Sequence, residues 1–422
     1  MKNKILLTII FFLSANILLA DEEKRDRIHS VRKVVNSVGE LQNKDVAITD
    51  SIKHMFVDGK VSGQLRTTYA GYNQKQVTTV DTYATAVGGI LKYELADFKG
   101  FSAGVALYAS KDIGFLTGDG GKQNSELSST DGSYADLSEA YVNYNYEDLN
   151  IRLGRQTLDT PLADSDDIRM IQNSFDAYTL TYAYKGLEFN AGHIVSWQGV
   201  DAGLDAGWSR IAEKTDGTNF GGVSYNDGLE FGLWYYNMTK QTNATYVEFG
   251  GNHDVNRDMQ IHAMMQYLHE SELDNSGIGA DIYGGLFEFV AYDIGFNIAY
   301  DKANKKAGLG SFAGVGGGAL YTNMDTMILD NIAVDRDAEA IVAGVTYSYD
   351  KFGFLYAYGD FSGEADTSGA KAHIVEQDMG VEYNFDDSLL ISAIYVISED
   401  KLTSSYTSDD WKRFQFMINY NF

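Results

Sequence analysis

Alternation of side-chain character with a period of two residues most constrains the fold of this chain. It recurs along segments of roughly ten residues, from Val61 to Phe422. In the last segment, aromatic and aliphatic side chains on one face are Phe414, Phe416, Ile418, Tyr420 and Phe422, and the intervening residues are Arg413, Gln415, Met417, Asn419 and Asn421. This period is that of a β-strand whose two faces meet different surroundings. Strands of soluble sandwiches alternate too, so other features must decide the fold class.

The connections between these segments separate a membrane barrel from a sandwich. Short links at 147–148, 185–186, 350–351 and 386–387 alternate with longer ones, which include 112–133, 159–173, 198–217, 302–337 and 399–409. Aromatic residues flank the short links: Tyr144, Tyr146, Tyr182, Tyr184, Tyr347, Tyr349, Tyr383 and Phe385. Short turns at one end, long loops at the other and an aromatic girdle are typical of outer-membrane barrels. We therefore predict an all-β, transmembrane antiparallel β-barrel.

Counting the alternating segments predicts about 18 strands. Their centres are Arg66, Gly88, Val105, Tyr141, Leu153, Leu180, Ala191, Val223, Leu233, Val247, Ala263, Leu286, Phe296, Val345, Tyr356, Gly380, Ala393 and Phe416. Composition agrees, because 43 glycines, 29 tyrosines and a single proline suit long strands joined by tight turns. A barrel of this size is expected to enclose a water-filled channel.

The N-terminus predicts export. Lys2 and Lys4 precede an apolar run that ends at Ala20, which is the pattern of a secretory signal peptide over 1–20, with a buried helix or a membrane anchor as the alternatives. A polar periplasmic segment would follow at 21–55, and the barrel domain at 56–422. Apolar residues at helical spacing, Ile28, Val31, Val35 and Val38, suggest a short amphipathic helix. Whether it associates with itself, inserts into the barrel mouth or stays unattached is left open.

Charge and residue types exclude several classes of function. The chain has 33 Lys and Arg against 59 Asp and Glu, a net charge of −26, which argues against a nucleic-acid partner. It has no cysteine, and its seven histidines are scattered without a catalytic or phosphate-binding motif. We therefore predict that the protein is not an enzyme and has no cofactor. Asp164, Asp166 and Asp167 are a candidate calcium site, although clustered loop acids are more often simply solvated.

Three stretches carry a resemblance to a known family. Asp50-Ser51-Ile52-Lys53 followed by residues 59–66 resembles the first strand of OprD-like outer-membrane porins, especially their epsilonproteobacterial branch. Leu153-Gly154-Arg155-Gln156 and the following residues to Ala177 are similar to that family's third extracellular loop and its flanking strand. The ending Ile418-Asn419-Tyr420-Asn421-Phe422 resembles the aromatic signal read by the barrel-assembly machinery.

The resemblance implies a constriction and a basic track. Loop 159–173 would fold into the pore, with Asp164, Asp166, Asp167 and Arg169 at the constriction. Basic groups on the lumen wall would be Arg66, Arg155 and Arg413, and the alternation independently predicts that Arg66 and Arg413 lie on the lumen face of the neighbouring first and last strands. The chain departs from the family in two places. The segment 389–398 carries no arginine, and Gln172 replaces the usual proline, so uptake of a specific amino acid cannot be carried over.

Acidic residues outnumber basic ones on the predicted lumen face: Glu188, Glu230, Glu288, Glu376, Asp378 and Glu382. A water-filled lumen tolerates such charges, and an excess of carboxylates favours cations over anions. The alternative is that these charges only hydrate the wall. If the arginines dominate the narrowest point, the preference would be weak or reversed.

These features predict an outer-membrane porin of a Gram-negative bacterium for passive diffusion of small hydrophilic solutes and ions, with a preference for cations. The alternative is a barrel that only anchors surface loops for adhesion or envelope structure. Expected partners are outer-membrane lipid and lipopolysaccharide, the barrel-assembly machinery through the last strand, and the solutes themselves. Self-association into a homo-oligomer is left open.

Overall fold

The computed structural model describes residues 48–422 except 77–78, 212–216, 313, 404–406 and 408. The expected signal peptide and the expected amphipathic helix lie outside the described residues. Just before the barrel, Ser51 caps a short helix, α3 (Ile52–Val57), by accepting a hydrogen bond from the His54 backbone N–H. Within the described part of the chain, no helix is long and apolar enough to cross a membrane.

Eighteen long strands form one closed antiparallel barrel. Closure is made by β2 (Lys60–Gln74) and β22 (Trp411–Asn421), whose register pairs Arg66 with Asn419 and Tyr72 with Arg413. The other strands are β3 (Thr82–Glu94), β5 (Phe101–Asp112), β6 (Ser133–Tyr146), β7 (Leu149–Gln156), β10 (Ser174–Tyr184), β11 (Leu187–Gln198), β12 (Thr218–Asp227), β13 (Leu229–Met238), β14 (Thr242–Asn256), β15 (Met259–Glu272), β16 (Ala280–Ala291), β17 (Ile294–Asn304), β18 (Ala338–Tyr349), β19 (Phe352–Gly363), β20 (Ala372–Asn384) and β21 (Leu389–Asp400).

The predicted fold class is confirmed, and each predicted strand centre lies within a different one of these strands. Two short strands, β1 (Ile48–Thr49) and β4 (Asp97–Phe98), pair with each other beside the barrel end. Alternation explains the strands physically. Exposed apolar side chains such as Leu65, Phe287 and Phe416 point outwards, and their neighbours in sequence point into the barrel.

Connection lengths differ between the two ends of the barrel. At one end the connections are short, from one residue (Gly228) to six residues (95–100). Their tight turns place Glu147, Lys185 and Asp350 at positive φ. Tyrosine and phenylalanine rings gather beside these turns, as in the stacked pair Tyr347 and Phe354. At the other end, 239–241 is short, and the longer loops are L2 (113–132), L3 (157–173), L4 (199–217), L7 (305–337), L8 (364–371) and L9 (401–410).

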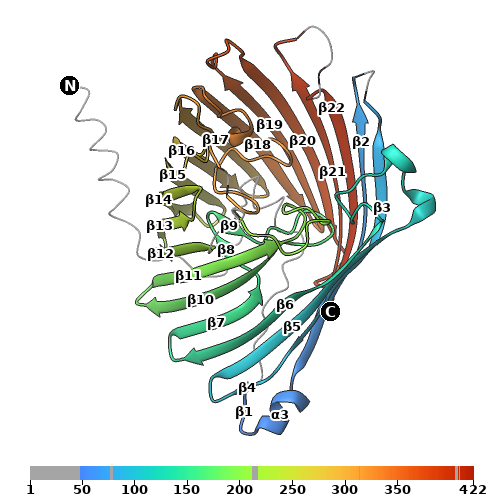
Figure 1. Cartoon of the computed structure of the whole chain (residues 1–422), viewed down its shortest axis with the longest axis vertical. Coiled ribbons are helices and arrows are strands. Elements are labelled where there is room, and N and C mark those ends of the chain that lie inside the picture. Colours follow the sequence, from blue (N-terminus) through green and yellow to red (C-terminus); the bar gives the residue numbers. More distant parts are fainter. Residues whose placement is uncertain (1–47, 77–78, 212–216, 313, 404–406, 408) are drawn as a thin grey trace.

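L3 and L7 fold into the barrel instead of projecting from it (Figure 1). L3 contains a small hairpin of β8 (Asp159–Thr160) and β9 (Ala163–Asp164), and L7 contains a 3-10 turn, η4 (Leu329–Asn331). The two loops touch at Ala163 and Val315. Apolar residues of both loops are buried against the inner wall: Leu158, Leu162, Val315, Leu320, Met324, Met327, Leu329 and Ile332. The expected water-filled interior is therefore partly filled by a hydrophobic cluster.

Candidate pore constriction

Arg66 joins the barrel wall to L3. On β2 it lies on the inner face with Gln64 and Thr68, and it is almost completely buried. Its Nη1 and Nη2 donate to the two carboxylate oxygens of Asp167 at 2.7 and 2.8 Å, and Nη1 also donates to the Arg169 carbonyl at 2.7 Å. A bidentate, buried pair of this kind sets both position and orientation of the loop.

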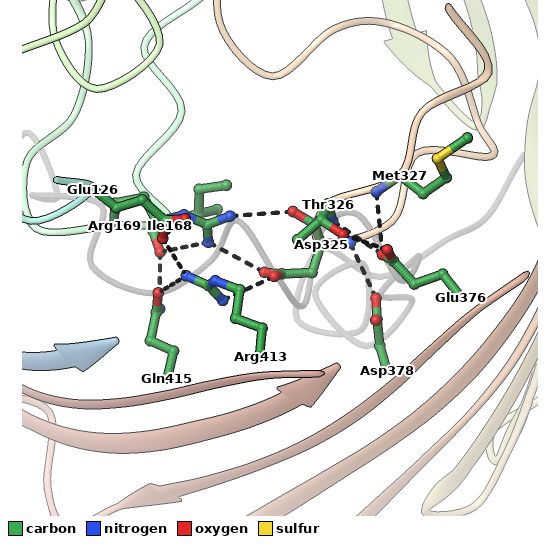
Figure 2. Close-up of polar contacts among 10 residues, drawn as sticks. All are labelled: Glu126, Ile168, Arg169, Asp325, Thr326, Met327, Glu376, Asp378, Arg413 and Gln415. Atoms are coloured by element: carbon green, nitrogen blue, oxygen red, sulfur yellow. Dashed lines mark hydrogen bonds and ion pairs between the residues drawn. The ribbon is translucent and has the colours of Figure 1, made fainter. Parts of the chain in front are cut away.

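Arg413 joins the wall to two further loops (Figure 2). It is fully buried on β22, and its guanidinium donates to Asp325 of L7 at 2.9 Å and to Glu126 of L2 at 3.0 Å. Its neighbour on the same face, Gln415, accepts from Arg413 and donates to the Ile168 carbonyl of L3 at 3.0 Å. One strand therefore holds L2, L3 and L7 together.

Arg169 of L3 shares its acidic partners with Arg413. It donates to the Asp325 carboxylate at 3.2 Å, and its Nε lies 3.6 Å from Glu126. Burial raises the pKa of Asp325, but the charges of Arg169 and Arg413 outweigh it and leave the pKa below its ordinary value. The same balance of burial against Arg413 and Arg169 lowers the pKa of Glu126. Both groups are carboxylates at neutral pH.

Glu376 and Asp378 hold L7 through its backbone (Figure 2). Glu376 accepts from the Thr326 N–H at 3.0 Å, from the Thr326 hydroxyl and from the Met327 N–H at 3.2 Å. Asp378 accepts from the Asp325 N–H at 3.0 Å. Both side chains are completely buried. They lie on the lumen face, as the alternation predicts, but they anchor a loop rather than facing water.

The remaining acidic residues also lie on the inner face. His262 on β15 lies between two of them, with Nδ1 2.7 Å from Glu288 and Nε2 3.2 Å from Glu230. Glu188 is exposed on β11 and accepts a hydrogen bond from the Asn190 side-chain amide at 2.8 Å. Glu382 lines a cavity of about 320 Å³ on the short-turn side of L3 and L7, together with Asp325 and Gln415. This cavity is an open part of the lumen beside the docked loops.

Arg155 does not join the constriction. On β7 it lies on the same face as Leu153, whose side chain is half exposed on the outer surface. Its register partner on the neighbouring strand β10 is Asp176. Its guanidinium contacts Asp136 at 3.5 Å and the ring of Trp208 of L4 at 4.3 Å. The predicted lumen position is corrected, because the inner-face neighbour at this level is Gln156 instead.

The three acidic residues of L3, Asp164, Asp166 and Asp167, make contacts that differ from one another. Both oxygens of Asp167 bind Arg66, whereas Asp164 lies in the β9 hairpin against L7, where its N–H donates to the Val315 carbonyl at 2.9 Å. Asp166 donates its N–H to Asp164 at 3.2 Å. Among the described residues, no group of three or more His, Asp or Glu side chains is arranged to hold a metal ion.

Sequence reasoning missed the inward folding of L7 and the two acidic residues that meet the arginines, Asp325 of L7 and Glu126 of L2. A signal was present, because the longest connection carries Leu320, Met324 and Met327, which a loop exposed to water would not need. Pairing of Asp325 with two arginines distant in sequence leaves no local pattern, so only the folded chain shows it.

Comparison with known proteins supports the fold. No family model matches the sequence, and no curated protein matches it. Three similar crystal structures are OpdK of Pseudomonas aeruginosa with vanillate, OccAB2 of Acinetobacter baumannii and a BenF-like porin from Pseudomonas fluorescens Pf-5. Their TM-scores are 0.73, 0.74 and 0.74, and their sequence identities are 17%, 17% and 14%. Each alignment covers 87% of this chain and 99% of the other chain. The chain therefore has the fold of OprD-like porins.

Proposed function

We propose that the protein is an outer-membrane porin, of the epsilonproteobacterial OprD-like branch, through which small hydrophilic solutes and ions diffuse with a preference for cations. The fold shared with porins supports a channel. The inward folding of L3 and L7 supports it too, because an adhesive barrel would use its long loops outside. The proposal includes contact with lipid and lipopolysaccharide, recognition of β22 by the assembly machinery, and self-association as a further step.

The cation preference is supported by the ion pairs that neutralise the arginines of the constriction. Arg66 pairs with Asp167, while Arg169 and Arg413 share Asp325 and Glu126. The positive charges at the constriction are therefore matched by carboxylates in contact with them. Uncompensated charge on the lumen face is then mainly acidic, from groups such as Glu382, which lines the cavity beside the docked loops. A lumen with this balance raises the local concentration of cations.

Reversal potentials in planar bilayers test the proposal. Purified protein is reconstituted, and the current is recorded under a gradient of KCl, first at low and then at high ionic strength. We expect a reversal potential of the sign that marks K⁺ as the more permeant ion. The preference should weaken near 1 M salt, where the Debye length falls to about 3 Å. Anion preference at low salt would contradict the charge argument, and absence of conductance would contradict the channel itself.

A further inference from the structure

Buried oxygen atoms without a partner gather where L7 meets β15. Both carboxylate oxygens of Asp330 in η4 accept no hydrogen bond, and neither does Oε1 of Glu270 on β15. The hydroxyl of Ser311 in L7 lies within reach of both carboxyl groups but meets neither at hydrogen-bond geometry. Asp330 is 7% exposed and Glu270 is completely buried. Such groups are costly in an interior unless something compensates them.

The folding of L7 brings these three side chains to one place. The Ser311 N–H donates to the Ala333 carbonyl at 3.3 Å, which joins the start of L7 to the segment just after η4. The Phe312 N–H donates to Oε2 of Glu270 at 3.0 Å, and this hydrogen bond joins the same segment of L7 to β15 of the barrel wall. Glu270 and Asp330 lie close enough for their charges to act on each other, and Ser311 lies beside both.

The charged groups around this place do not neutralise it. The Lys306 ammonium uses its donors on the carbonyls of Glu270 and Ala280, both at 3.1 Å, and on Asp281 at 3.0 Å. Asp301 on β17 adds a further negative charge near Asp330. Asp301 itself is satisfied by Thr322 and Gln266. The charge of Lys306 reaches Glu270, but its donors are taken by the two carbonyls and by Asp281, so among the described residues no cation contacts the carboxyl oxygens of Glu270 or Asp330.

A proton shared between the carboxyl groups would satisfy one oxygen of each, and the Ser311 hydroxyl would have to turn and donate to the remaining Asp330 oxygen. A hard cation would satisfy all of these oxygens at once, because Ca²⁺ takes six to eight oxygen ligands in a flexible arrangement that accommodates carboxylates, hydroxyls, carbonyls and water. Mg²⁺ demands a near-ideal octahedron and keeps more of its water. We propose that Glu270, Ser311 and Asp330 form a Ca²⁺ site that ties L7 to the barrel wall. The site is distinct from the acidic residues of L3, and it does not depend on the solute that the barrel carries.

Calcium titration of the purified protein tests this site. The protein in detergent micelles is treated with a chelator, dialysed and titrated with CaCl₂ at pH 7.5 in a calorimeter, and thermal unfolding is followed in parallel. We expect saturable binding of one Ca²⁺ per chain, a raised unfolding temperature with Ca²⁺, and a smaller effect of Mg²⁺. Asp330→Asn and Glu270→Gln should each weaken Ca²⁺ binding at least tenfold.

A matched variant separates this site from the other candidate. Asp164→Asn removes an acidic group from L3 and should leave Ca²⁺ binding unchanged. Asp330→Asn removes buried charge, so its calcium-free form should unfold at the same temperature as the calcium-free wild type or higher, which shows that lost binding is not lost folding. Ca²⁺ binding that survives Asp330→Asn, or that Asp164→Asn abolishes, overturns the proposal. So does absence of binding to the wild type.

Discussion

Arg66 on the first long strand and Asp167 in L3 form a bidentate ion pair, with both guanidinium–carboxylate distances below 3 Å and both side chains buried. The pair ties L3 directly to the wall. Because the arginine is satisfied by a loop rather than by solvent or solute, the pair has a structural role that a lumen-facing charge would lack.

Removing one partner of this pair should destabilise the protein. Arg66→Ala leaves the Asp167 carboxylate buried without its cation, a change that costs about 3–5 kcal/mol in other buried pairs. We expect a lower unfolding temperature in detergent, measured by circular dichroism. The double variant Arg66→Met with Asp167→Leu should recover most of the loss, because neither charge is left behind. Equal stability of Arg66→Ala and wild type would show that the pair is not maintained in solution.

Glu376 is expected to control the docking of L7. Glu376→Ala leaves the N–H groups of Thr326 and Met327 without acceptors, at a cost of about 1–3 kcal/mol for each buried group. The loop should then leave the wall more often, which we expect to appear as larger and noisier single-channel currents. Glu376→Gln keeps an acceptor oxygen and serves as the control. Identical current traces for all three proteins would argue against this anchoring role.

Asp325 is expected to set the sign of ion selectivity. Asp325→Asn leaves Arg169 and Arg413 with Glu126 as their remaining acidic partner, so net positive charge appears at the constriction. The reversal potential under a KCl gradient should shift towards anion preference. Glu188→Gln, an exposed wall position away from the constriction, should shift it far less. A larger shift from Glu188→Gln would place the selective point elsewhere.

The pH dependence of selectivity follows from Asp325 and Glu126. Their folded pKa values lie below the ordinary range near 4, so the stability they contribute is present above that range and is lost as the pH falls through the lower folded values. We expect the difference in reversal potential between wild type and Asp325→Asn to stay constant from pH 7 to about pH 5. This difference should shrink only below about pH 4, as Asp325 loses its charge. A transition near pH 6 would contradict this assignment.

Gly316 is expected to be essential for the contact between L7 and L3. It has a φ of +100°, and an added Cβ would lie within 2 Å of the Asp164 carbonyl oxygen. Gly316→Ala should therefore lower the unfolding temperature and loosen both loops, with increased protease sensitivity as the readout. Gly121→Ala, where a Cβ meets open space, is the control. Wild-type protease resistance of Gly316→Ala would mean that the loops do not meet there.

The sequence by itself determined the barrel and the face of nearly every strand. Alternation is a local property, since a one-residue step turns a side chain from lipid to lumen, and the lumen positions of Arg66, Arg413, Glu376 and Asp378 could be read from it. Arg155 was the exception, because family resemblance rather than alternation placed it in the lumen.

Only the tertiary structure decided which lumen charges are free. Arg413 meets Asp325 from 88 positions away, and Glu376 meets Thr326 from 50 positions away, so no local pattern marks either contact. Burial of these groups depends on how L7 fills the barrel, and that depends on the packing of Met324 and the other apolar residues of L7 against the inner wall as much as on charge. Alternation assigns a side chain to the inside of the barrel, whereas its partners there are set by where distant loops come to rest.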